Sequence, residues 1–97
     1  MAITVKIEIV FEPQAKEEVV DLGREAVEVL QKQPGFLGIQ QWQAQEGSSI
    51  MALLQWDRVE AFHACKRSPY WLAVMPTWSD LLESYEISLS TMILLPL

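Results

Sequence analysis

The order in which apolar residues change their spacing constrains this chain more than any other feature of its sequence. Residues 3–12 alternate between apolar and mostly polar positions, which predicts a strand with one buried face. Residues 14–32 carry apolar side chains at helical spacing instead, with acidic residues early and Lys32 at the end. The chain therefore begins as a strand followed by an amphipathic helix.

The next part of the chain predicts a β-hairpin. Pro34-Gly35 ends the first helix, because proline cannot continue it and glycine is common just beyond a helix. Residues 36–46 and 50–56 have the composition and spacing of strands, and a Gly-Ser-Ser turn joins them. Alternation in the first of these strands places five side chains on one face: Leu37, Ile39, Gln41, Gln43 and Gln45.

A second helical region follows the hairpin. Asp57 or a neighbour is placed to cap a helix over residues 58–67. Ser68-Pro69 restarts the helix, with serine at the N-cap and proline at the first helical position. Pro76 is expected to break or kink this stretch, and a last short segment then continues to Ser84.

Residues 85–95 alternate once more and complete the order β-α-β-β-α-β within a single domain, residues 1–97. Two right-handed βαβ units that share a hairpin give a ferredoxin-like α+β fold, with both helices on one face of the sheet. The opposite face would be bare and half polar. Its apolar members are Val10, Trp42, Ala44, Met92 and Leu94.

Size and composition suggest what covers that bare face. A domain of 97 residues buries only about 60–65% of its unfolded surface, yet 51% of the residues are hydrophobic. Either part of the surface is reserved for a second copy of the chain, or the core of a monomer is unusually dense. Two sheets packed face to face would cover each other, so we expect a homodimer.

Charge and cysteine content exclude several classes of partner. The net charge is −6, and seven basic residues are scattered among thirteen acidic ones. Nucleic acid and anionic membranes need clustered Lys and Arg, so neither is expected to bind. The single cysteine, Cys65, forbids an internal disulfide. With no secretory signal and no apolar run long enough for a membrane span, we expect a cytoplasmic protein.

Four short segments together resemble the antibiotic biosynthesis monooxygenase family, within the dimeric α+β-barrel superfamily. They are Pro34-Gly35-Phe36-Leu37-Gly38, Leu54-Gln55-Trp56-Asp57, Glu60-Ala61-Phe62 and Ser68-Pro69-Tyr70-Trp71. Most of them are fold signals, so they identify the architecture better than the chemistry. The resemblance implies a dimeric barrel. It also implies oxidation of phenols or quinols without metal or flavin, degradation of haem, or no catalysis.

The resemblance further implies a pocket between the sheet and the helices, lined by residues from the segment 58–80. The candidate lining residues are Phe62, Cys65, Tyr70, Trp71, Met75 and Trp78. Aromatic rings pack well against flat apolar ligands, although the same rings can simply fill the core of a small domain. Met75 stands where haem-degrading relatives carry an axial histidine, which argues against haem degradation.

His63, the single histidine of the chain, is a weak candidate for a catalytic residue. It falls at the border between the apolar and the solvated sides of its predicted helix. It lines the pocket or lies half-exposed on the surface. Cys65 is reactive only if positive charge favours its thiolate; otherwise it is a buried, inert side chain. One histidine and one cysteine cannot form a closed zinc site, so we expect no metal. The resemblance, to a family whose oxygenases work without metal or flavin, implies no cofactor.

Three functions remain open on this basis. The first is a cofactor-independent monooxygenase acting on a small aromatic such as a quinol or polyphenol. The second is a non-catalytic dimeric module that binds a small aromatic or apolar ligand or has a structural role. The third is a haem-binding or haem-degrading protein. Oxygen uptake with quinols and anthrones distinguishes the first from the second.

Overall fold

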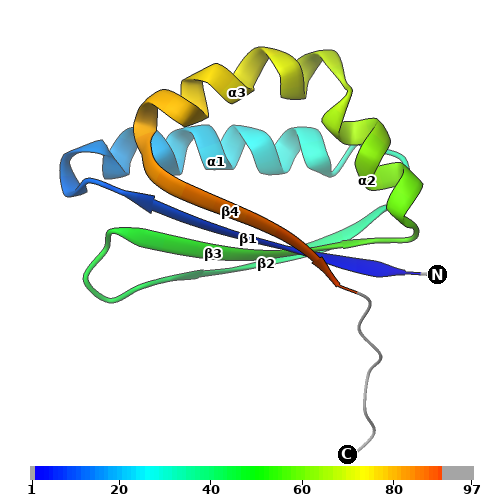
Figure 1. Ribbon diagram of the computed structural model, residues 1–97, viewed down its shortest axis with the longest axis horizontal. Coiled ribbons are helices and arrows are strands. Elements are labelled where there is room, and N and C mark those ends of the chain that lie inside the picture. Colours follow the sequence, from blue (N-terminus) through cyan, green and yellow to red (C-terminus); the bar gives the residue numbers. More distant parts are fainter. Residues whose placement is uncertain (1, 91–97) are drawn as a thin grey trace, which may run out of the picture.

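A computed structural model describes residues 2–90 of the chain and shows an α+β fold with three helices on one face of a four-stranded sheet (Figure 1). The elements follow in the order β1 Ile3–Phe11, a 3₁₀ turn Pro13–Ala15, α1 Lys16–Leu30, β2 Phe36–Gln43, β3 Ser49–Trp56, α2 Val59–Lys66, α3 Pro69–Leu81 and β4 Leu82–Ser90. This is the predicted ferredoxin-like order, with the second helical region divided in two.

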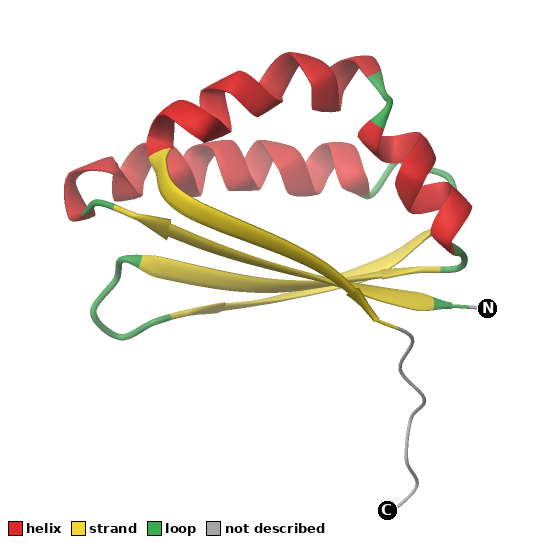
Figure 2. Ribbon diagram, in the orientation of Figure 1, coloured by secondary structure: helices red, strands yellow, loops and turns green. Residues whose placement is uncertain are grey.

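The sheet is antiparallel throughout, with the strand order β2-β3-β1-β4. The strands β1 and β3 lie in the middle, because the second strand of each βαβ unit pairs with the first strand of the other: β2 pairs with β3, and β4 pairs with β1. The helices cover one face and leave the other without a layer (Figure 2). The alternation of β1 explains this arrangement, since Ile3, Val5 and Phe11 are buried toward the helices whereas Lys6 and Glu8 are exposed.

A β-bulge at the start of β2 makes the predicted face of Leu37 wrong. The register passes from Phe36 opposite Trp56 to Gly38 opposite Gln55, so Leu37 is an extra residue on this strand. Because a bulge adds one residue, Phe36 packs toward the helices and Leu37 is 60% exposed, although we expected Leu37 to share a face with Ile39. The strand also ends at Gln43, before the predicted limit.

Of the two helices after the hairpin, α3 begins with the predicted serine cap, whereas α2 begins without a side-chain cap. The Ser68 hydroxyl accepts a hydrogen bond from the backbone N–H of Trp71 at 3.3 Å, as a serine N-cap should. At the start of α2 the N-cap is Arg58, whose side chain makes no capping bond. Asp57 instead donates its backbone N–H to the carbonyl of Gly35 at 2.8 Å, which ties α2 to the end of α1.

Pro76 does not break α3, so the part of our expectation in which the helix ends there and a separate short segment follows is wrong. The helix runs unbroken to Leu81, and β4 begins at Leu82 rather than at Tyr85. A proline inside a helix leaves the carbonyl four residues earlier without its donor. Here that carbonyl belongs to Leu72, a residue that is 63% exposed to solvent. The predicted strand residues from 91 onward, including Met92 and Leu94, lie outside the described residues.

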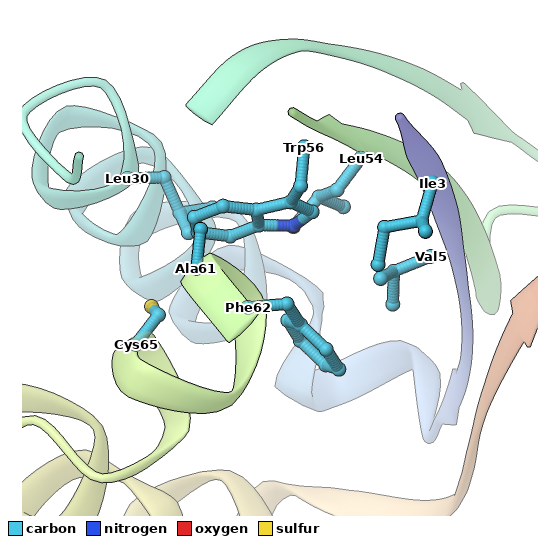
Figure 3. Close-up of a cluster of buried hydrophobic side chains, with 8 residues drawn as sticks. All are labelled: Ile3, Val5, Leu30, Leu54, Trp56, Ala61, Phe62 and Cys65. Atoms are coloured by element: carbon cyan, nitrogen blue, oxygen red, sulfur yellow. The ribbon is translucent and has the colours of Figure 1, made fainter. Parts of the chain in front are cut away.

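The densest packing lies at one end of the sheet, beneath α2 (Figure 3). The Trp56 ring is fully buried there, with the rings of Phe36 and Phe62 at 5.2 and 5.9 Å between centroids. Within residues 2–90 the indole N–H of Trp56 is buried without a hydrogen-bond partner. The core cluster comprises Ile3, Val5, Leu30, Leu54, Trp56, Ala61, Phe62 and Cys65. No helix in this part of the chain is long and apolar enough to cross a membrane.

Candidate functional site

A cavity of about 590 Å³ lies between the helices and the sheet, beside the dense core. Residues of α1 and α3 form its roof, and residues of all four strands form its floor. This volume is within the range of small-molecule sites in proteins. The cavity is therefore large enough to hold a ligand of several rings.

The position of α3 relative to the sheet explains why the cavity exists. The helix is strongly apolar, yet none of its residues is buried. Tyr70, Trp71, Val74, Met75 and Trp78 all face the cavity and are only partly covered. The helix thus stands away from the sheet, and its apolar face lines a space rather than filling a core.

Gly23 of α1 marks where the two roof helices approach each other. A Cβ atom added at Gly23 would lie 3.9 Å from the Cη2 atom of Trp78, which is an ordinary van der Waals distance. The two helices are close here, but an alanine would also fit. Glycine is therefore not required at this position for steric reasons.

The structure brings five of the six predicted lining residues to the cavity wall: Cys65, Tyr70, Trp71, Met75 and Trp78. Phe62 is different, because it is fully buried and does not line the cavity. Its ring is held between Trp56 and Trp71, with the Trp71 ring edge-on at 6.4 Å, and Lys66 lies over it at 4.9 Å. Phe62 therefore supports the wall from behind.

His63 lies outside the cavity. It is half-buried on α2, with its ring centroid 5.9 Å from that of Phe62 and a tilted orientation. His63 and Cys65 are two residues apart on α2, a rotation of about 200° around the helix axis, so His63 points away from the face that carries Cys65. The geometry gives His63 no route to a ligand in the cavity.

Two titratable groups of the cavity wall are held in their neutral forms. Burial raises the pKa of the Cys65 thiol above its ordinary value. Burial, and then the negative charge of Glu25, raises the pKa of Tyr70. Neither group is ionised near neutral pH, so Cys65 has the character of an inert buried thiol and Tyr70 that of a hydrogen-bond donor.

The sequence interpretation missed the contribution of α1 and the sheet. We expected a pocket lined from residues 58–80, but Arg24, Gln41, Gln43 and Tyr85 also line the cavity. One signal was available: the alternation of β2 placed Gln41 and Gln43 on the same face as Ile39, which is directed toward the helices. Hydrogen-bonding side chains on a face that should be buried indicate a site.

The charged residues at the cavity suggest where it opens. Arg24 and Glu28 line it from α1, and both are exposed to solvent. Arg24 lies 3.4 Å from Asp21 in an exposed ion pair. Across residues 2–90, no group of three His, Cys, Asp or Glu side chains is arranged to hold a metal ion.

Solved structures with the same fold come from distant organisms. Rv0793 from Mycobacterium tuberculosis superposes with a TM-score of 0.87 at 13% identity, covering 96% of each chain. A variant of SnoaB, a cofactor-independent oxygenase from Streptomyces nogalater, gives 0.85 at 20% identity, covering 94% of this chain and 92% of that one. A conserved protein from Methanosarcina mazei gives 0.85 at 22%, covering 93% and 91%.

These identities are low enough that the three structures establish the fold alone. No curated protein sequence matches the chain. The family assignment comes instead from a family model, "Antibiotic biosynthesis monooxygenase", which matches residues 2–77. That match includes β1 through most of α3, and with them most of the cavity wall. The chain belongs to the antibiotic biosynthesis monooxygenase family.

Proposed function

We propose that this protein is a cofactor-independent monooxygenase that oxidises a small aromatic, such as a quinol, an anthrone or a polyphenol, inside the cavity. The observation that carries the proposal is a cavity of about 590 Å³, lined mainly by apolar and aromatic side chains, in a member of this family. SnoaB, a cofactor-independent oxygenase, shares the fold and supports the proposal by analogy.

The proposed reaction needs no electron source besides the substrate. An anthrone loses a proton to give its enolate, which donates electrons to dioxygen. One oxygen atom replaces the two hydrogens of the ring methylene as a carbonyl, and the other leaves with those hydrogens as water. Both oxygen atoms, the two hydrogens and four electrons are thereby accounted for.

The protein would act by positioning and by its electrostatic environment. Trp71 and Trp78 offer flat faces for the substrate, and the surrounding aliphatic side chains exclude water. Arg24 brings a positive charge to the rim, where it would favour the anionic form of the substrate. Cys65 and Tyr70 stay neutral near pH 7, so neither is assigned as the base.

The test is oxygen consumption with a panel of anthrones and quinols, followed by mass spectrometry of the product formed under ¹⁸O₂. We expect uptake above the uncatalysed rate and one labelled oxygen in each product molecule. Ala52 lies on the cavity floor, so Ala52→Phe should strongly lower the activity by placing a ring where the substrate would lie. Ala73→Phe is the matched control, because Ala73 is exposed on α3 and does not line the cavity.

A different result would support the second function. If no compound accelerates oxygen uptake, but the parent binds an aromatic ligand saturably and Ala52→Phe does not, the protein is a ligand-binding module. Retained activity in Ala52→Phe would place the chemistry elsewhere and contradict the proposal.

We also propose that a second copy of the chain covers the bare face of the sheet. Four apolar side chains lie on this outer face: Val10, Trp42, Met51 and Leu53. Among them Val10 and Trp42 are 37% and 48% exposed. On the same face, Lys6 Nζ lies 2.7 Å from Glu8 Oε1, so the two opposite charges partly neutralise each other. A mixed face of this kind is typical of protein interfaces.

A further inference from the structure

The cavity floor is built from rows of side chains that cross all four strands. The register of the sheet gives two complete rows, Gln41–Ala52–Ile7–Ile87 and Gln43–Ile50–Ile9–Tyr85. All eight of these residues line the cavity. The floor therefore has a defined pattern across the sheet, from the edge strand β2 to the edge strand β4.

Hydrogen-bonding groups occur at both ends of this pattern and not in its middle. Gln41 and Gln43 lie at the β2 edge, and Tyr85 lies at the β4 edge. The central positions on β3 and β1 are alanine and isoleucine only. Adjacent strands are about 4.8 Å apart, so the two polar ends are separated by three spacings, or about 14 Å.

These polar groups are available to a ligand. Among the described residues, neither glutamine carboxamide nor the Tyr85 hydroxyl takes part in a hydrogen bond. Tyr85 is 49% exposed and lines the cavity. A carboxamide both donates and accepts, and a phenol does the same, so each end can bind a hydroxyl or a carbonyl oxygen.

We propose that Gln41 and Gln43 at one edge and Tyr85 at the other select a planar fused-ring ligand that carries an oxygen substituent at each end of its long axis. The rings would lie over Ile7 and Ala52, where the small alanine leaves room, with Trp71 and Trp78 above them. The inference rests on the proposed function, because it requires that the cavity bind an aromatic molecule. It adds which groups orient that molecule.

Two probes of the same shape test the idea. Anthraflavic acid is a planar tricyclic quinone with a hydroxyl at each end, and anthraquinone is the same ring system without them. Quenching of tryptophan fluorescence reports binding, since Trp71 and Trp78 line the cavity. We expect Gln41→Leu and Tyr85→Phe each to weaken anthraflavic acid about 3- to 10-fold, the effect of one lost hydrogen bond.

The controls separate polar recognition from general damage to the fold. Anthraquinone has no end hydroxyls, so the substitutions remove no hydrogen bond to it. Its affinity for both variants should be within about twofold of its affinity for the parent. Gln40→Leu is the matched variant, because Gln40 lies on the same strand but faces the opposite side of the sheet. It should leave the affinity for anthraflavic acid unchanged.

Other outcomes overturn the inference in distinguishable ways. If anthraflavic acid binds the parent and both variants equally, the polar ends do not select the ligand, while the cavity remains a binding site. If anthraquinone weakens in parallel with anthraflavic acid, the substitutions act through the shape of the cavity. If neither probe binds the parent, this inference fails, and oxygen uptake with the panel of anthrones and quinols decides the proposed function separately.

Discussion

Gly35 is the residue whose conformation matters most for joining the two halves of the fold. Its φ of +83° lies in the left-handed region, which L side chains rarely adopt. A Cβ added there would lie 2.5 Å from the Asp57 Oδ1 atom and 2.7 Å from the Ala61 Cβ atom. The glycine thus serves both the turn and the close approach of α2.

Replacing Gly35 should therefore be costly. We expect Gly35→Ala to lower the free energy of unfolding by about 2–4 kcal/mol, from backbone strain and from overlap with α2. Gly38→Ala is the control, because no atom lies within 4 Å of a Cβ built there and its φ is not positive. Urea denaturation of both variants measures the difference. Equal stabilities would contradict this account of the turn.

Tyr70 provides a prediction about alkaline pH. Burial raises its pKa in the folded state above the ordinary value of 10.0, and Glu25 adds to the effect. Above the unfolded pKa the unfolded chain loses this proton while the folded chain keeps it. The unfolded state then binds fewer protons, so stability falls as pH rises toward the folded pKa.

The variant Tyr70→Phe isolates this effect. In the parent, the Tyr70 hydroxyl is buried without a hydrogen-bond partner among the described residues. Its removal should therefore leave the stability near pH 7 unchanged or slightly higher. Above about pH 10 the variant should lose less stability than the parent. Thermal unfolding at pH 7 and pH 10.5 provides the comparison. A variant as alkali-sensitive as the parent would assign the loss to other groups.

At the scale of elements, the distinction between core and cavity wall follows from how the helices sit. α2 packs tightly on the end of the sheet, where Trp56 is fully buried. α3 has no buried residue and spans the cavity. Trp56 at the end of β3 and Trp71 in α3 thus have different environments, and substitution of each by alanine distinguishes them.

We expect Trp56→Ala to cost about 3–5 kcal/mol, because it leaves a cavity in a dense core. Trp71→Ala should cost about 1–2 kcal/mol, since the side chain borders an existing space and loses mainly its edge contact with Phe62. It should also weaken the binding of an aromatic ligand. Denaturation curves and fluorescence titration measure the two effects. A loss of several kcal/mol for Trp71→Ala would make this ring part of the core.

At the scale of the whole molecule, the uncovered sheet face leads to a test of assembly. We expect the parent to sediment at about twice its chain mass of 11.1 kDa at micromolar concentration. Leu53→Glu should shift it to monomer, because Leu53 lies centrally on the outer face. The new carboxylate lies opposite Lys6 in the register, so the isolated monomer should tolerate it.

The matched control for assembly is Leu72→Glu. Leu72 is 63% exposed on α3, on the helical side of the molecule, so this variant should remain a dimer. A parent that sediments as a monomer would contradict the proposed interface. Dissociation of both variants would point to a general effect of charge rather than to the sheet face.

The sequence by itself determined the order of the elements, the buried face of β1 and the start of α3 at Ser68-Pro69. These features depend on local spacing and capping, which neighbouring residues fix. The single domain over residues 1–97 and the cytoplasmic location remain predictions. Five of the residues that line the cavity were predicted from the side chains of residues 58–80 and from the family resemblance.

Only the tertiary structure decided the remainder. The bulge at Leu37 depends on pairing between strands, and α3 continues unbroken through Pro76 although a proline removes one helical hydrogen bond. Whether an aromatic ring fills the core, as Phe62 does, or borders a cavity, as Trp71 does, depends on how far each helix stands from the sheet. That distance results from the packing of residues far apart in the chain, and local periodicity carries no information about it.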